Sequence, residues 1–355
     1  MGSSYKYIIL IYRKSVFFIS FLTLYVTKFL FFLIRPRLII SYNDSEVRDG
    51  FGAQFHRVLS LSYVAHFLNL KMIRPNVSNL TLHPLDPFRD MNQLMDFMLQ
   101  TNQVIFRSRS FLELKNIPPK LKVVRKDSLK IKSCFWLGLT SFFRRNTVLI
   151  TSCEAHSISD LHPDFYYSSI NFYFNELVAS LHEVGNSQEI IIHYRQGPGN
   201  FTIYPGQTIS RQLPINLFLN QLEIISKHTD ISKFTLRVFT DAPYSDYQFT
   251  PPTTQIRLWE NTPGFDGYRV TYVGNKLEEL IAPYANKLGL KYIIDRDTDP
   301  FQMILQMARS PILLMSRSSL SYVAGLFNFG CYVYYAPSFW HSKPSNWLHF
   351  ERFEG

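Results

Sequence analysis

The chain has 355 residues, of which 46% are hydrophobic and 18% charged. This length allows two domains of ordinary size, the apolar fraction excludes a disordered protein, and three cysteines are too few for a disulfide scaffold. The net charge of +10 is concentrated in residues 1–40 and in the segment Arg107–Arg145. A nucleic-acid-binding protein would spread its basic residues over a folded face among aromatic side chains, so we expect no nucleic-acid partner. The basic segment is either a solvated face or a surface for anionic lipid or an acidic acceptor.

The N-terminus contains an almost continuous apolar run, Ser15–Ile34, of 20 residues. At about 1.5 Å per residue such a helix just crosses a hydrocarbon layer of about 30 Å. No small-residue cleavage site follows the run, so the sequence predicts an uncleaved signal anchor, with residues 1–37 as cytoplasmic tail and transmembrane helix. A buried N-terminal helix is the alternative. The remainder would face a lumen, as in a glycoprotein, and four N-x-S/T sequons lie at Asn43, Asn76, Asn79 and Asn200.

After Pro36, short apolar strands alternate with longer helical stretches. A strand is expected at Leu38–Tyr42, a helix from Ala53 to about Leu70, and short strands at Lys71–Arg74 and Val148–Thr151. In the second half the expected strands are Glu189–Tyr194, Phe234–Phe239, Lys291–Ile294, Ile312–Met315 and Cys331–Tyr335, with helices at Ile215–Lys227, Lys276–Leu288, Pro300–Met307 and Ser319–Phe327. This alternation predicts parallel sheets covered by helices on both faces. The polar stretch Glu183–Gln188 divides the lumenal part into α/β domains at 38–185 and 186–355, with a ligand cleft expected between them.

A glycine turn, Asp49–Arg57, joins the first strand to the first long helix. Gly50 and Gly52 would let backbone N–H groups approach a phosphate or sugar, with Gln54 and His56 adding polar groups. A purely structural turn is the alternative. The turn lacks the third glycine of a dinucleotide fingerprint and the Lys-Ser/Thr of a P-loop.

Two further motifs follow apolar strands. His193 and Arg195 lie at the end of the strand Glu189–Tyr194. Side chains at this end of a strand point into the ligand crevice of an open α/β sheet, and an arginine there can bind a diphosphate with two hydrogen bonds. A strand-end arginine paired with a carboxylate is the alternative. The sequence Ser316–Ser321 closes another strand and opens a helix. Its Ser318, Ser319 and Ser321 indicate an anion site at the helix start, or capping alone.

The acidic run Asp295–Asp299 has two interpretations. Asp295, Asp297 and Asp299 could hold a divalent ion against a nucleotide diphosphate. Alternatively, Asp299 caps the helix that begins at Pro300 and contacts a nucleotide, which is the interpretation we favour. Motifs for serine hydrolases and for structural zinc are absent from the sequence.

The order of these motifs resembles the fucosyltransferase superfamily that includes the α1,2-, α1,6- and protein O-fucosyltransferases. The resemblance covers Gly50 to Gly330 and includes Thr240-Asp241 at the end of a strand. It implies a GT-B-like fold of two facing Rossmann-like domains, GDP-fucose or another nucleotide sugar as donor, inversion at the anomeric carbon, no metal or other cofactor, and a Golgi location. Carried over by position, Arg195 resembles the arginine on the β-phosphate and His193 its partner. Asp299 resembles the acid at the guanine or ribose, Asp241 joins the donor site, and Ser318, Ser319 and Ser321 resemble the phosphate loop.

The chain departs from many members of this family after His193-x-Arg195. Gln196 and Gly197 stand where a second arginine would follow, and Ala53 stands where most α1,2 members have Asn. From the resemblance and the apolar N-terminal run together, we expect a membrane-anchored glycosyltransferase that transfers fucose to a glycan or glycoprotein by single displacement. His193, Asp241 and Glu154 are the candidate bases. The alternatives are a metal-dependent glycosyltransferase using the three aspartates and a catalytically degenerate glycan-binding membrane protein.

Overall fold

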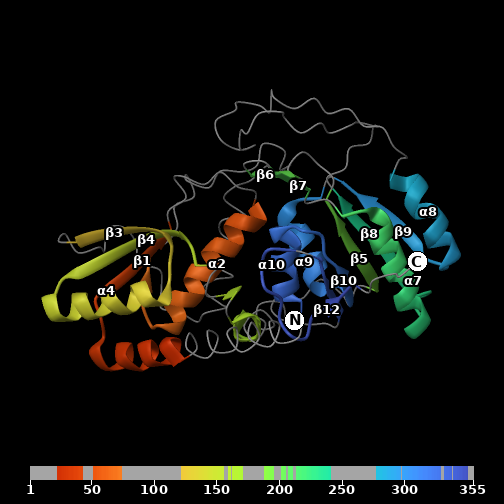
Figure 1. Ribbon diagram of the computed structural model, residues 1–355. Coiled ribbons are helices and arrows are strands. Elements are labelled where there is room, and N and C mark those ends of the chain that lie inside the picture. The colour runs from red at the N-terminus through yellow and green to blue at the C-terminus, as the bar shows by residue number, and fades with distance from the viewer. Residues whose placement is uncertain are drawn as a thin grey trace, which may run out of the picture.

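The computed structural model describes thirteen stretches of the chain. They are residues 22–42, 51–73, 121–155, 159–160, 162–170, 188–195, 201–204, 207–210, 213–240, 277–296, 298–328, 332–337 and 339–350. Their helices and strands are arranged around two parallel sheets, with a separate hairpin of β6 (Phe201–Tyr204) and β7 (Gln207–Ser210) (Figure 1). The expected α/β class with parallel sheets is confirmed. The boundary expected near residue 185 falls outside the described residues and stays a prediction.

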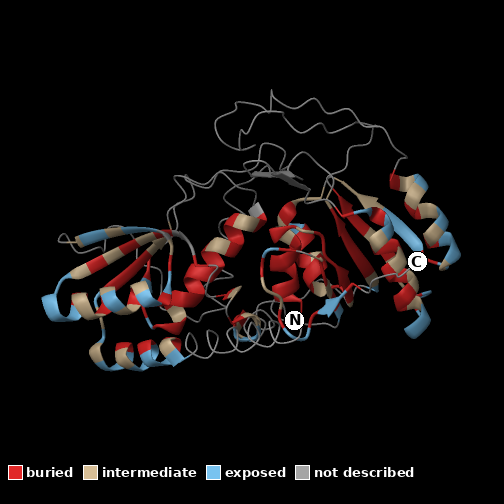
Figure 2. Ribbon diagram, viewed as in Figure 1, coloured by how far each residue is buried: buried red, intermediate tan, exposed pale blue. Residues whose placement is uncertain are grey.

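The first sheet has the order β2-β1-β4-β3, and all its neighbouring strands are parallel. Its strands are β1 (Leu38–Tyr42), β2 (Lys71–Met72), β3 (Leu121–Ser128) and β4 (Thr147–Glu154). Helix α4 (Ile131–Arg144) joins β3 to β4, and α2 (Phe51–Phe67) follows β1. Helix α2 is buried along most of its length because it reaches from this sheet to a helix of the second sheet (Figures 1 and 2).

The second sheet has the order β12-β11-β10-β5-β8-β9 and is parallel throughout. Its strands are β5 (Glu189–Tyr194), β8 (Thr235–Thr240), β9 (Lys291–Asp295), β10 (Ile312–Leu314), β11 (Tyr332–Tyr335) and β12 (Leu348–His349). Its helices are α7 (Ile215–His228), α8 (Leu277–Lys287), α9 (Pro300–Arg309) and α10 (Ser319–Phe327).

The winding of this sheet defines a reversal point. The chain starts at β5, adds β8 and β9 on one side, and then returns to add β10, β11 and β12 on the other. This is the doubly wound order of dinucleotide-binding domains, in which ligands bind beyond the carboxyl ends of the strands where the direction of winding reverses. Here that point lies between β5 and β10. Both strands are apolar and fully buried along most of their length, as expected for parallel strands covered on both faces.

Residues 22–34 form a helix that packs on the first sheet's side of the molecule. Leu24, Thr27 and Phe31 are buried, and the Phe31 ring lies against Gly138 of α4. Within the described stretches, no helix is long and apolar enough to cross a membrane. The first part of the run Ser15–Ile34, for which a membrane span was expected, lies outside those stretches. The described part is buried along one face and exposed along the other, so it matches the alternative of a buried N-terminal helix only in part.

Candidate functional site

The ends of β5 and β10 bring the two strand-end motifs together. Ile192 of β5 is in register with Leu314 of β10, so the residues that follow each strand leave the sheet at the same level. Arg195 is half-buried, and its Nη1 donates a hydrogen bond to Ser318 Oγ at 3.4 Å. The arginine thus contacts the serine loop at the reversal point of the sheet, as the positions of the two motifs predicted.

His193 is buried behind this contact. Its Nδ1 lies 2.9 Å from Ser316 Oγ, so the histidine ties the end of β5 to the first serine after β10. This hydrogen bond fixes the ring and the backbone of the loop relative to each other. The ring therefore supports the loop from within the protein, and the expected place of His193 near the nucleotide stays a prediction.

The four serines after β10 have different environments. Ser318 is the N-cap of α10, and its Oγ accepts a hydrogen bond from the Leu320 N–H at 3.3 Å. Ser321 Oγ donates to the Ser316 and Ser318 carbonyl oxygens at 3.3 and 3.1 Å, which closes the loop on itself. Ser319, at the first position of the helix, makes no hydrogen bond through its hydroxyl within the described stretches. Capping therefore explains Ser318 and loop closure explains Ser321, whereas Ser319 has a hydroxyl to offer to a ligand.

The start of α2 lies directly against the start of α10. A Cβ placed on Gly52 would come within 2.4 Å of Leu320 N and 2.5 Å of Leu320 Cα. Only glycine permits this approach, because the obstacle is backbone rather than a flexible side chain. Both helices begin here, and a helix N-terminus carries a partial positive charge from its unpaired N–H groups. Two such ends and the Arg195 guanidinium therefore make this edge of the sheet suitable for an anion.

The remaining residues of the glycine turn have other positions. Gln54 and His56 are buried, and the His56 ring packs 4.4 Å from the His341 ring and 5.0 Å from the Tyr322 ring, between centroids. His341 Nδ1 in turn lies 3.4 Å from Asp160 Oδ1. The structure thus places His56 in the packing between α2 and α10 rather than at the open edge of the sheet. Gly50 and Asp241 lie outside the described residues, and so do the donor contacts expected of them.

Asp299 caps α9, which confirms the first half of the favoured interpretation, whereas its contact with a nucleotide stays a prediction. Its Oδ1 accepts hydrogen bonds from the Phe301 and Gln302 N–H groups at 2.9 and 3.2 Å. Pro300 follows at the first helical position, where its missing N–H has no cost. Because β9 and β5 are parallel members of one sheet, Asp299 and Arg195 both lie beyond the carboxyl ends of their strands.

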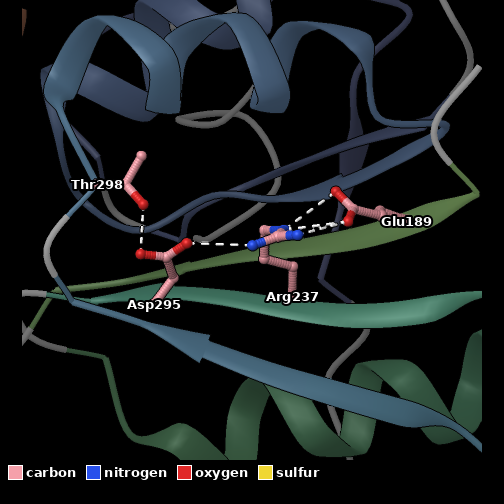
Figure 3. Close-up of polar contacts among 4 residues, drawn as sticks. All are labelled: Glu189, Arg237, Asp295 and Thr298. Atoms are coloured by element: carbon pink, nitrogen blue, oxygen red, sulfur yellow. Dashed lines mark hydrogen bonds and ion pairs between the residues drawn. The ribbon is translucent and has the colours of Figure 1, made fainter. Parts of the chain in front are cut away.

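Asp295 belongs to an ion-pair network on the same sheet (Figure 3). Arg237 of β8 donates from Nη1 to Asp295 Oδ2 at 3.1 Å and from Nη2 to Glu189 Oε1 at 2.8 Å, and Thr298 Oγ1 donates to Asp295 Oδ1. The hydrogen bonds to Glu189, and then the charges of Glu189 and Asp295, raise the pKa of Arg237. This arginine was not singled out in the sequence. The sequence did contain a sign of this network, because Arg237 is the one cation in the otherwise largely apolar strand TLRVFT. The two neighbouring strands each have an acid at one end, Glu189 in β5 and Asp295 in β9.

The metal site considered as an alternative would use Asp295, Asp297 and Asp299, and two of these aspartates have partners within the chain. Asp295 is paired with Arg237, and Asp299 is hydrogen-bonded to two backbone N–H groups. Asp297 lies outside the described residues. Among the side chains that are described, no group of three His, Cys, Asp or Glu could hold a metal ion.

Comparison with known proteins gives a distant structural likeness. No protein-family model matches the sequence, and no curated protein matches it. Two structures of the protein O-fucosyltransferase POFUT1, in complex with GDP and with GDP-fucose, have TM-scores of 0.38 and 0.41 at 10% sequence identity. They cover 89% and 88% of this chain and 99% and 97% of their own. A second GDP-fucose complex, also at 10% identity, has a TM-score of 0.40 and covers 89% of this chain and 98% of its own.

Proposed function

We propose that this chain is a glycosyltransferase that binds a nucleotide-diphosphate sugar at the reversal point of the six-stranded sheet. The observation that carries the proposal is the contact of Arg195 with Ser318 between β5 and β10, beside the starts of α2 and α10. The resemblance of the ordered motifs to the fucosyltransferase superfamily makes GDP-fucose the donor we favour. A glycan or glycoprotein is the proposed acceptor, on the side of the first sheet, and a Golgi membrane the proposed location.

The proposed reaction is a single displacement with inversion. An acceptor hydroxyl attacks the anomeric carbon, the bond from that carbon to the β-phosphate oxygen breaks, and the nucleotide diphosphate leaves with the bonding electrons. Negative charge grows on the β-phosphate as this bond lengthens. Arg195 can donate two parallel hydrogen bonds to it, and the Ser319 hydroxyl and the start of α10 can add further donors. A charge-assisted hydrogen bond of this kind contributes about 1.5–3 kcal/mol.

We propose that the reaction needs no divalent ion. Positive charge at the diphosphate comes from Arg195 and two helix N-termini, and two of the three aspartates that could have held an ion have partners within the chain. The general base is not assigned. His193 has its Nδ1 engaged by Ser316, and Asp241 and the Glu154 side chain lie outside the described residues.

Thermal unfolding of the full chain with a panel of nucleotides tests this proposal. With EDTA present, GDP should raise the midpoint of thermal unfolding more than UDP or ADP, because GDP-fucose is the donor we favour. A ligand at 100 times its Kd stabilises the folded chain by about 2.7 kcal/mol. Arg195→Gln should lose most of this shift. Lys287→Gln removes one cation from an exposed pair with Glu223 and should keep it, which controls for net charge.

Two outcomes would contradict the proposal. If EDTA abolished both the shift and sugar transfer, the transferase would depend on a metal ion. If GDP gave a shift but no acceptor received sugar, the chain would be a nucleotide-sugar or glycan-binding protein without transferase activity.

A further inference from the structure

The helix formed by residues 22–34 is apolar on the face that packs and also on the face that does not. Its inner residues Leu24, Thr27 and Phe31 are buried at helical spacing. Most outer residues are large and apolar, with 37% to 66% of their surface exposed: Leu22, Tyr25, Val26, Phe29, Phe32 and Leu33. The exposed residue Lys28 is the one charged side chain of the helix, and its ammonium lies 4.4 Å from the centroid of the Phe67 ring. A surface helix in water normally has polar residues on its outer face, so a continuous apolar stripe indicates that something covers it.

Basic residues gather at the C-terminal end of this stripe. Arg35 and Arg37 follow the helix, and Arg144 and Arg145 end α4 beside it. Arg37 Nη1 donates to the Arg145 carbonyl oxygen at 3.1 Å, and the backbone N–H of Arg37 donates to Ser141 Oγ at 3.2 Å, so the two chain segments are held together. Residues 22–42 and 130–152 contain no acidic residue. Exposed Phe142 and Phe143 accompany the arginines on α4.

We propose that this face, the outer stripe of helix 22–34 together with the four arginines, binds the surface of an anionic phospholipid bilayer with the helix axis parallel to the membrane plane. Apolar side chains of such a helix enter the boundary between headgroups and acyl chains, and arginines pair with lipid phosphates. The inner face stays on the protein, where the Phe31 ring lies against Gly138. For residues 22–34, this orientation differs from the membrane span that the sequence predicted. It is independent of the proposed transferase activity.

Flotation of the full chain with vesicles tests the partner. The chain should float with vesicles of phosphatidylcholine and phosphatidylserine and much less with phosphatidylcholine alone. Arg144→Gln with Arg145→Gln should weaken partitioning by about five-fold per residue, and Phe29→Gln with Phe32→Gln by about ten-fold or more. Tyr332→Gln removes an aromatic side chain that is 52% exposed on β11 of the other sheet, and should change nothing. The proposal would be overturned if the chain bound neutral vesicles as well as anionic ones. It would also be overturned if the chain formed dimers and did not bind vesicles.

Spin labels on the helix test its orientation. Leu22→Cys and Leu33→Cys place labels on the same outer stripe, in a chain whose Cys153 and Cys331 are replaced by serine. Cys134 is buried, and burial raises the pKa of its thiol to about 12, so it should remain unlabelled. A helix parallel to the membrane gives both labels the same depth. A spanning helix would separate their depths by about 16 Å, which would refute the proposed orientation.

Discussion

Replacing Gly52 by alanine perturbs the contact on which the arrangement of the candidate site depends. The added Cβ would lie 2.4 Å from Leu320 N, about 1 Å short of the 3.4 Å at which ordinary van der Waals contact begins. Since the obstacle is the backbone of α10, relief requires that α2 and α10 move apart by about this distance. Overpacking of this kind costs about 1–3 kcal/mol of folding free energy. A displacement of 1 Å at a reacting centre can cost about 100-fold in rate.

Urea unfolding and GDP titration of the same samples measure both effects. We expect Gly52→Ala to unfold at lower urea and to bind GDP at least ten-fold more weakly, with a larger loss of transfer rate. Gly325→Ala is the matched control in α10, because its Cβ would meet the Trp347 ring at 2.9 Å and the Val333 side chain at 3.3 Å rather than backbone. It should lose stability with little change in GDP affinity. Native stability and native GDP affinity in Gly52→Ala would refute the close approach of the two helices.

Three further predictions concern stability. Asp299→Ala should lower the free energy of unfolding, measured with urea, by about 1 kcal/mol because α9 loses its cap. Asp299→Asn should retain most of this stability, and an equal loss in both variants would argue against capping. Arg237→Gln should cost about 1–3 kcal/mol, since Glu189 and Asp295 lose their shared cation, and an unchanged midpoint would mean that solvent replaces the pair. Burial lowers the pKa of His162 below 6.5, so the unfolded chain binds a proton that the folded chain does not, and stability should fall as pH drops below about 6.5. His162→Asn should flatten this pH dependence, and an unchanged slope would assign it to other groups.

The centre of the second sheet could be predicted from the sequence because β5 and β10 are buried on both faces. Such strands are continuous apolar runs, and β5 and β10 each end at a polar motif. The placement of Arg195 next to the serine loop followed from the rule that parallel strands end at one edge. Their role in donor binding stays a prediction, because a fold does not define its ligand.

The parts that escaped prediction depend on contacts between distant residues or on exposed edges. Strand β3 was missed because it combines apolar and charged residues without regular alternation, at the edge of its sheet, where Val123 is exposed. The role of Gly52 depends on Leu320, and that of His56 on His341, so neither could be inferred from the local glycine turn. Both faces of helix 22–34 carry large apolar residues, and only the structure shows which of them are buried.

Calorimetric titration with GDP, GMP and guanosine, in native chain and Arg195→Gln, tests the central claim most directly. If Arg195 and the start of α10 hold the β-phosphate, the native chain should bind GDP at least ten-fold more tightly than GMP, and the variant should bind the two about equally. Its guanosine affinity should be unchanged. A preference for GDP over GMP that survives Arg195→Gln would contradict the assignment of the diphosphate to the junction of β5 and β10.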